Sequence, residues 1–277
     1  EAINRKLVQS SLTLLQNYDD LLPLQNLDTL KIASVAIGEN SSTFQQVLSN
    51  YVAVTHFTIS ENADSKEQAY LLNKLSEYNL VIASVHKSNS NPWVSYKIDR
   101  KTDILLQSIS MQSKLVVAVF ANPYSLNSFL LTNNFDALVL SYQNSKIAQN
   151  KTAQAIFGGF VFEGKIPVST KHYKSNIGIK TYPIRMRYVI PEERNFKSEN
   201  LYKIDSIIQN AISLQATPGC QVLIVKDGSV FFNKAYGFHT YQKETPVLTT
   251  NLYDVASITK IISTVPVLMQ MVDSGYL

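Results

Sequence analysis

Apolar residues in the first half of the chain gather in short runs, separated by polar segments with helical spacing. Most of these runs are apolar at consecutive positions, as strands buried on both faces require. The five runs that we expect to form strands are residues 31–37, 52–59, 80–85, 115–120 and 137–141. The helices expected between them are residues 42–49, 65–78, 100–110, 125–131 and 145–157. This alternation predicts an α/β fold, with a mainly parallel sheet sandwiched by helices.

The two ends of the chain carry different patterns. The apolar positions of residues 1–18 have mostly helical spacing and run into an extended segment near residues 12–15. The C-terminal part predicts an amphipathic helix, a hairpin around an Asp-Gly turn and a buried helix, at residues 199–214, 221–236 and 261–272. We therefore expect an α/β domain, a linker and a truncated α+β segment, at residues 1–173, 174–197 and 198–277.

The composition fits a globular chain, because 45% of the residues are hydrophobic and 17% are charged. The net charge is only +4 and no run of basic residues suggests a nucleic acid partner. No apolar run is long enough to span a membrane. Cys220 is the single cysteine, so it forms no intramolecular disulfide, and we expect it to be buried. The chain begins at Glu1 inside an expected helix, which indicates a piece of a longer protein.

Ser257 and Lys260 form a Ser-x-x-Lys pair at the start of the last expected helix. A spacing of three residues places both side chains on one helical face. A serine hydroxyl needs a neighbouring base to become a nucleophile, and a desolvated lysine can act as that base. The catalytic interpretation is therefore acyl transfer by Ser257 with Lys260 as its base. The alternative is a helix start with a solvated lysine.

The carboxyl ends of the expected strands are where an α/β sheet binds ligands. Gly38 stands there without the further glycines of a dinucleotide-binding turn, so we expect no such cofactor. Glu39 is the only carboxylate at an expected strand end, and we interpret it as a solvated loop residue. Trp93 is expected to anchor its own loop, with stacking on a sugar as the alternative. The histidines lack the spacing of a metal site, so we expect no metal; they are His56, His86, His172 and His239.

Several stretches of the first domain together resemble the C-terminal α/β domain of glycoside hydrolase family 3, especially its β-N-acetylglucosaminidase-like members. They are residues 12–24, 31–38, 119–126 and 155–168, the last ending in Gly-Lys-Ile-Pro-Val. The resemblance implies an α/β sandwich that packs against a catalytic (β/α)8 barrel, and the catalytic aspartate of this family belongs to that barrel. No segment of this chain matches the barrel, so we expect the first domain to be catalytically silent by itself.

Residues 199–277 resemble the opening of the serine β-lactamase family, class C type, which includes esterases and D-amino-acid peptidases. The resemblance rests on the hairpin with its Asp227-Gly228 turn and on residues 249–260 and 271–277. It implies that Ser257 is the nucleophile and Lys260 its base partner. The family also has a tyrosine motif and a Lys-Thr-Gly-like strand, neither of which stands in this sequence.

The two resemblances together predict a fragment of a fused bacterial hydrolase. It would join a glycosidase accessory domain to the start of a serine hydrolase, with a carbohydrate or peptidoglycan-derived substrate reached through the missing barrel. Cell-wall glycan turnover and a periplasmic or secreted location would suit such a protein. The alternative is a non-catalytic structural or carbohydrate-binding module that keeps both folds without activity.

Overall fold

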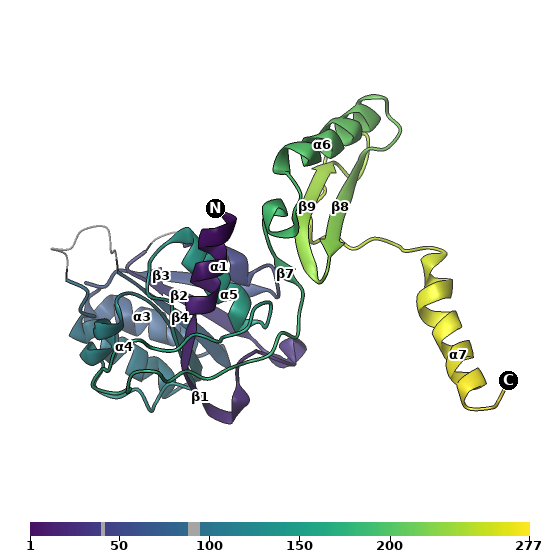
Figure 1. Ribbon diagram of the computed structural model, residues 1–277. Helices are drawn as coiled ribbons and strands as arrows, with labels where there is room; N and C mark the ends of the chain where they lie inside the picture. Colours follow the sequence, from purple (N-terminus) through teal and green to yellow (C-terminus); the bar gives the residue numbers. More distant parts are fainter. Residues whose placement is uncertain (40–41, 88–94) are drawn as a thin grey trace. The chain divides into compact units, whose positions relative to one another are not determined.

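The computed structural model describes residues 1–39, 42–87 and 95–277 (Figure 1). Two compact units make up this part of the chain. The first unit contains Glu1–Asn195 together with Val225–Phe231, and the second contains Phe196–Ile224 and Phe232–Leu277. Each unit is described by itself.

A six-stranded sheet forms the centre of the first unit, in the order β1-β6-β5-β4-β2-β3. Its strands are β1 (Thr13–Asn17), β2 (Ile32–Ile37), β3 (Val54–Ile59), β4 (Leu80–His86), β5 (Lys114–Phe120) and β6 (Ala137–Leu140). All neighbouring pairs are parallel except β1, which runs antiparallel to β6 at one edge. The mainly parallel sheet predicted from the sequence is confirmed.

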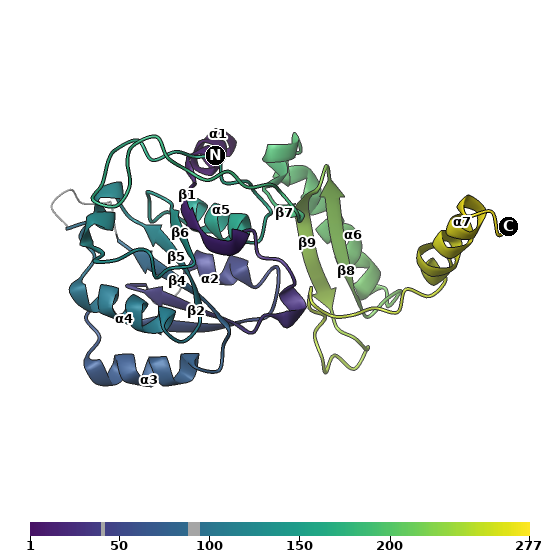
Figure 2. The ribbon, with the colours of Figure 1, turned by 90° about the horizontal axis from the view of Figure 1, so that it is seen from below.

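Helices cover both faces of this sheet (Figure 2). They are α1 (Ala2–Ser11), α2 (Thr43–Leu48), α3 (Ser65–Leu75), α4 (Arg100–Ser110) and α5 (Lys146–Ile156). Buried apolar residues of α3 and α4 join one hydrophobic cluster, and those of α1, α2 and α5 join the other. The sandwich of helices around the sheet is therefore as the sequence predicted.

Local side chains define where these helices begin. Asp64 forms a capping box at the start of α3, accepting from the amides of Lys66 and Glu67. Single side-chain caps at Ser42, Asp99 and Ser145 start the other helices of the alternating part. Each cap satisfies amide groups that the first turn of a helix leaves without a partner.

One expected helix differs in the structure, and one expected extended segment has a pairing that the sequence did not indicate. The helix predicted at residues 125–131 is instead a short 3-10 helix, Pro123–Ser128. Asn122 caps it, and Leu126 and Phe129 are both fully buried three residues apart, which matches the 3-10 repeat. The extended segment expected near residues 12–15 is the edge strand β1, whose antiparallel pairing the sequence pattern did not indicate.

A partly buried carboxylate with two buried cationic partners ties a later segment of the first unit to its helices. Glu193 lies in a 3-10 helix, Pro191–Arg194, and its carboxylate accepts hydrogen bonds from Arg5 at 2.6 Å and Lys151 at 2.8 Å. Lys151 is completely buried and its ammonium group also lies 4.0 Å from the centre of the Phe160 ring. Burial by itself would raise the pKa of Glu193, but the hydrogen bonds from Lys151 and Arg5 outweigh it and lower that pKa.

The second unit contains a helix and most of a hairpin. The helix is α6 (Ser198–Ser213), and the hairpin strands are β8 (Gly219–Lys226) and β9 (Ser229–Gly237). At the turn, Asp227 and Gly228 both have positive φ, of 48° and 67°, as a type I′ turn requires. Asp205 of α6 accepts hydrogen bonds from Lys234 at 3.0 Å and from the Tyr236 hydroxyl at 2.5 Å, which fixes the helix on the hairpin.

The hairpin turn belongs to the first unit. There β7 (Arg187–Tyr188) pairs in parallel with Ser229 and Val230 of β9.

The last helical segment of the second unit consists of a π-helical turn, Lys260–Thr264, followed by helix α7 (Val265–Asp273). Among the described residues, no helix has the length and apolar character needed to cross a membrane.

Replacing Glu193 by Gln should destabilise the first unit strongly. The substitution leaves Lys151 and Arg5 charged in a buried site without their carboxylate, at a cost of about 3 kcal/mol in the free energy of unfolding. Denaturant unfolding followed by near-ultraviolet circular dichroism measures this difference. Glu77→Gln is the matched control, because the Glu77 side chain is 68% exposed in its pair with Lys31, and it should cost less than about 0.5 kcal/mol.

The same comparison has a predicted pH dependence. The folded-state pKa of Glu193 is lowered, so the carboxylate stabilises the folded state. Its contribution to the free energy of unfolding is fully present above the unfolded-state pKa of about 4.3. The difference between the wild type and Glu193→Gln should disappear as the pH falls through the lower folded-state pKa. A difference that persists unchanged into that acidic range would contradict the role given to the Glu193 carboxylate.

Candidate functional site

The backbone turns sharply just before Ser257. Ala256 has a positive φ of 44°, which is strained for a residue with a side chain. The Asp254 carboxylate accepts a hydrogen bond from the Ala256 amide at 2.7 Å and holds this conformation. Helical structure begins immediately afterwards at Ile258, so Ser257 lies at the N-terminus of the helical segment. This position exposes the Ser257 hydroxyl where helix amides favour developing negative charge.

Ser257 and Lys260 are brought together by this helical start. The Lys260 Nζ donates a hydrogen bond to the Ser257 Oγ at 3.0 Å. Their backbones are also joined, because the Lys260 amide donates to the Ser257 carbonyl at 3.1 Å. The hydroxyl and the amine are therefore within the distance over which a proton can pass between them.

The helix behind the pair is irregular where it carries Lys260. The sequence predicts one helix over residues 261–272, but the structure has a π-helical turn at Lys260–Thr264 before α7. Pro266 lies in the first turn of α7 and has no amide hydrogen, so it cannot donate to the preceding turn. Wider turns of this kind often occur at functional sites.

The surroundings of the pair are open to solvent. Every residue from 252 to 277 is exposed, including Ile261 and Leu268 on the helix that carries Lys260. A lysine becomes an effective base when burial removes water from its ammonium group. The pair therefore has the contact that acyl transfer needs, but the described residues do not enclose it.

A second polar cluster lies at the carboxyl ends of the strands in the first unit. His86, at the end of β4, has a fully buried side chain whose Nδ1 lies 2.9 Å from the Glu39 carboxylate and 2.8 Å from the Asn144 Oδ1. The Gln149 amide donates to Glu39 at 3.0 Å and to Asn144 at 2.8 Å. The imidazole also stacks on the Phe120 ring, with the ring centres 4.9 Å apart.

The interpretation of Glu39 as a merely solvated loop residue is corrected by this cluster. Its side chain is 30% exposed, but one carboxylate oxygen is fixed by both His86 and Gln149. Desolvation by burial lowers the pKa of His86, in spite of the opposing effects of Asn144 and Glu39. The sequence missed this pairing because Glu39, His86 and Gln149 are far apart along the chain. The only indication in the sequence was the position of Glu39 and His86 at the ends of predicted strands.

Two other histidines that the sequence singled out have hydrogen-bonding partners. His56 bonds to the hydroxyls of Ser34 and Ser49, and His172 lies 2.8 Å from the Phe129 carbonyl. Trp93 lies outside the described residues. Cys220 is half-buried rather than buried, and desolvation raises the pKa of its thiol. Among the described side chains, no group of three or more His, Cys, Asp or Glu residues could hold a metal ion.

Comparison with protein families confirms both sequence resemblances at the level of the family. Residues 12–209 match the model of the glycosyl hydrolase family 3 C-terminal domain, and residues 204–277 match the β-lactamase model. The first match covers most of the chain, so the chain belongs to the glycosyl hydrolase family 3 C-terminal domain family. Its second part is a β-lactamase-like segment, which makes the chain a hydrolase-related fragment.

Individual relatives match over limited lengths. Protein flp of Staphylococcus aureus is 38% identical over 63 residues, which are 23% of this chain and 13% of that protein. A Salmonella agona protein described as a D-alanyl-D-alanine carboxypeptidase is 35% identical over 101 residues, 34% of this chain and 23% of that protein. The chain thus spans less than a quarter of these relatives. The structure of a Listeria innocua β-glucosidase matches with a TM-score of 0.50 and 16% sequence identity. The match covers 62% of this chain and 26% of the β-glucosidase chain, and it shows the fold alone.

The histidine of the strand-end cluster should make stability depend on pH. Because the folded-state pKa of His86 is lowered, the unfolded chain binds this proton more readily, and stability is lost as the pH falls from about 7.5 to 5.5. Urea unfolding across this range should show a decline that His86→Asn makes shallower. The slope that remains would report His56, whose pKa burial also lowers. Equal slopes in the two proteins would contradict the prediction.

Proposed function

We propose that residues 198–277 contribute the nucleophile and its base to a serine hydrolase of the β-lactamase type. The observation that carries this proposal is the hydrogen bond of 3.0 Å between the Lys260 Nζ and the Ser257 Oγ at the head of a helix. In the reaction, Lys260 in its neutral form takes the hydroxyl proton while the Ser257 Oγ bonds to an amide or ester carbonyl carbon. The carbon–nitrogen or carbon–oxygen bond then breaks and the leaving group receives a proton.

The isolated chain is not a competent acyl-transfer enzyme in this proposal. Residues 252–277 are exposed, so the described residues do not enclose the Ser257–Lys260 pair. These residues also form no water-free site in which an oxyanion would be stabilised. Loss of even one oxyanion-hole donor typically lowers a rate by about 10²–10³. The relatives are several times longer than the matched segments, which supports the idea that further elements complete such a site.

The first domain is proposed to serve a glycosidase of the β-N-acetylglucosaminidase-like type as its second domain. Its carboxyl edge presents Glu39, fixed by His86 and Gln149, as an oriented acceptor for sugar hydroxyl groups. The catalytic carboxylates would come from a (β/α)8 barrel outside this chain. A carbohydrate or peptidoglycan-derived substrate and a role in cell-wall glycan turnover follow from joining the two parts. We also propose that the first domain ends at residue 173 and that the β-lactamase-like segment begins at residue 198.

The competing function is a non-catalytic module that keeps both folds and binds carbohydrate. The oriented Glu39 favours this alternative for the first domain, because sugar recognition needs placed acceptors but no nucleophile. The two functions differ in whether Ser257 forms a covalent bond with an acylating probe once its site is complete.

Incubation of the purified chain with a fluorophosphonate or a reactive penicillin should give no stoichiometric mass shift, because the Ser257–Lys260 pair is exposed. Intact-mass spectrometry measures the labelled fraction. Ser257→Ala tests the nucleophile, and Ser263→Ala is the matched control on the same exposed segment. Stoichiometric labelling that Ser257→Ala abolishes would refute the inactivity and support the nucleophile. Labelling lost equally in Ser263→Ala would refute the assignment.

The nucleophile itself is tested by grafting residues 198–277 onto the rest of the Salmonella carboxypeptidase, in place of its matching segment. We expect the folded chimera to be labelled and to lose labelling by at least about 10³-fold with Ser257→Ala or Lys260→Met. Circular dichroism verifies that each chimera folds. A folded but unlabelled wild-type chimera would favour the non-catalytic module.

The isolated chain should not hydrolyse aryl N-acetylglucosaminides. Two carboxyl groups about 5–9.5 Å apart across a sugar are needed for this reaction, and the strand-end cluster offers the single carboxylate Glu39. Release of a chromogenic phenol by homogeneous protein measures the activity, and Glu39→Gln identifies its source. Turnover that disappears in Glu39→Gln would overturn the assignment of catalysis to a barrel.

A further inference from the structure

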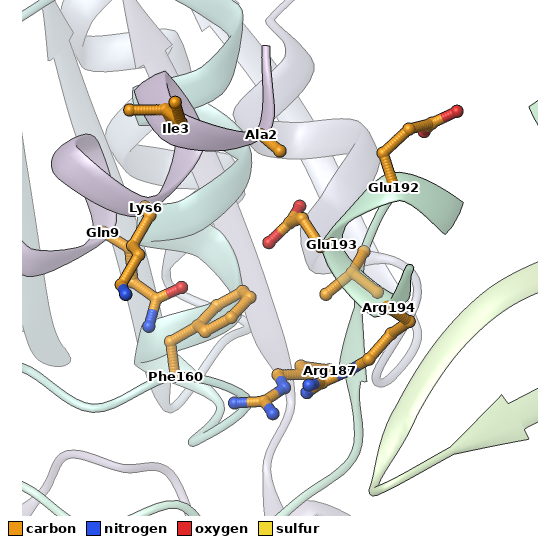
Figure 3. A pocket seen from close by; sticks show the side chains of 10 residues that line it. Ala2, Ile3, Lys6, Gln9, Phe160, Arg187, Glu192, Glu193 and Arg194 are labelled. Atoms are coloured by element: carbon orange, nitrogen blue, oxygen red, sulfur yellow. The ribbon is translucent and has the colours of Figure 1, made fainter. Parts of the chain in front are cut away.

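A cavity of about 400 Å³ opens in the first unit between α1 and the segment that contains Arg187 and Arg194 (Figure 3). Lys6 and Gln9 reach toward it from α1, and Phe160 lies between them and the two arginines. Glu192 also lines the cavity, although its carboxylate end points outward in Figure 3. The volume lies within the range of pockets that hold small organic molecules.

Of the two glutamates that line the cavity, Glu193 is already neutralised. Both oxygens of Glu193 accept charged hydrogen bonds, one from Arg5 at 2.6 Å and the other from Lys151 at 2.8 Å. These two cations therefore balance and exceed the charge of Glu193. The positive charges of Arg187, Arg194 and Lys6 at the cavity remain in addition to them.

The two arginines converge on one neutral oxygen. Arg187 Nε donates to the Ser229 Oγ at 2.8 Å, and Arg194 donates to the same oxygen through Nε at 2.9 Å and Nη2 at 2.6 Å. Ser229 is completely buried, so this shared acceptor is fixed in position. Two guanidinium groups held side by side repel each other, and an anion placed between them would relieve that repulsion.

The rest of the cavity is suited to the body of a small ligand. The Arg187 guanidinium lies 5.8 Å from the centre of the Phe160 ring, so the charged donors adjoin an aromatic surface. On the α1 side of the cavity, Gln9 supplies an uncharged amide and Ile3 supplies an apolar surface. Guanidinium groups match the oxygen geometry of carboxylates and phosphates.

We propose that this cavity is a binding site for a small organic anion, with the phosphate or carboxylate head group held by Arg187 and Arg194. Lys6 contributes long-range attraction from α1, and Phe160 and Gln9 contact the uncharged body. The cavity shares no lining residue with the Ser257–Lys260 pair or with the strand-end cluster, so the proposal does not depend on the function proposed for either.

Titration of the ¹⁵N-labelled chain at constant ionic strength tests the site. The probes are glucose 6-phosphate, glucuronate, inorganic phosphate and neutral glucose. We expect saturable shifts of the Arg187 and Arg194 side-chain resonances with a Kd near or below about 1 mM for at least one organic anion. Tighter binding of glucose 6-phosphate identifies a phosphate head group, and tighter binding of glucuronate identifies a carboxylate.

Three variants separate the site from general charge. Arg187→Gln should raise the Kd by about tenfold or more, and Lys6→Gln by about threefold. Arg100→Gln removes an exposed guanidinium outside the cavity and should leave the Kd unchanged. Lys6 is exposed on α1, so its variant tests the proposal even if an arginine variant fails to fold. No saturation by any anion, equal binding of glucose, or equal affinity of all variants would overturn the proposal.

Discussion

The need to bury both faces of a parallel sheet governs the first unit. Strands β4 and β6 are buried at every position, and two separate hydrophobic clusters lie on the two sides of the sheet. Each crossover must return over a face, so the polar turns collect at the ends of the strands. His86, Glu39 and Asn144 meet there for this reason, and the buried imidazole then fixes one oxygen of a partly exposed carboxylate.

The segment that follows this sandwich is positioned by charge rather than by regular structure. The Glu193 carboxylate accepts charged hydrogen bonds from the buried Lys151 and Arg5, and the low exposure of both cations makes this geometry strict. The same 3-10 helix carries Arg194, which shares the Ser229 hydroxyl with Arg187. Glu193 and the buried Ser229 hydroxyl thus together fix the segment that brings the two arginines to the cavity.

The second unit is organised by a few polar contacts and leaves much apolar surface exposed. Asp205 holds α6 to the hairpin through Lys234 and Tyr236, but none of the described residues of α6 is buried. A short segment of this kind gains little stability from burial. The contact between Ser257 and Lys260 forms nevertheless, because residues three apart on a helical turn meet without help from a core.

The sequence by itself determined the features that depend on neighbours along the chain. Consecutive apolar runs indicated buried strands, the Asp227-Gly228 pair indicated the hairpin turn, and the three-residue spacing indicated that Ser257 meets Lys260. Only the tertiary structure decided which distant residues share a site. Three such contacts are the antiparallel pairing of β1, the fixation of Glu39 by His86 and the meeting of two arginines at Ser229. They join residues that are 35 or more positions apart, so their encounter depends on how the helices and strands pack.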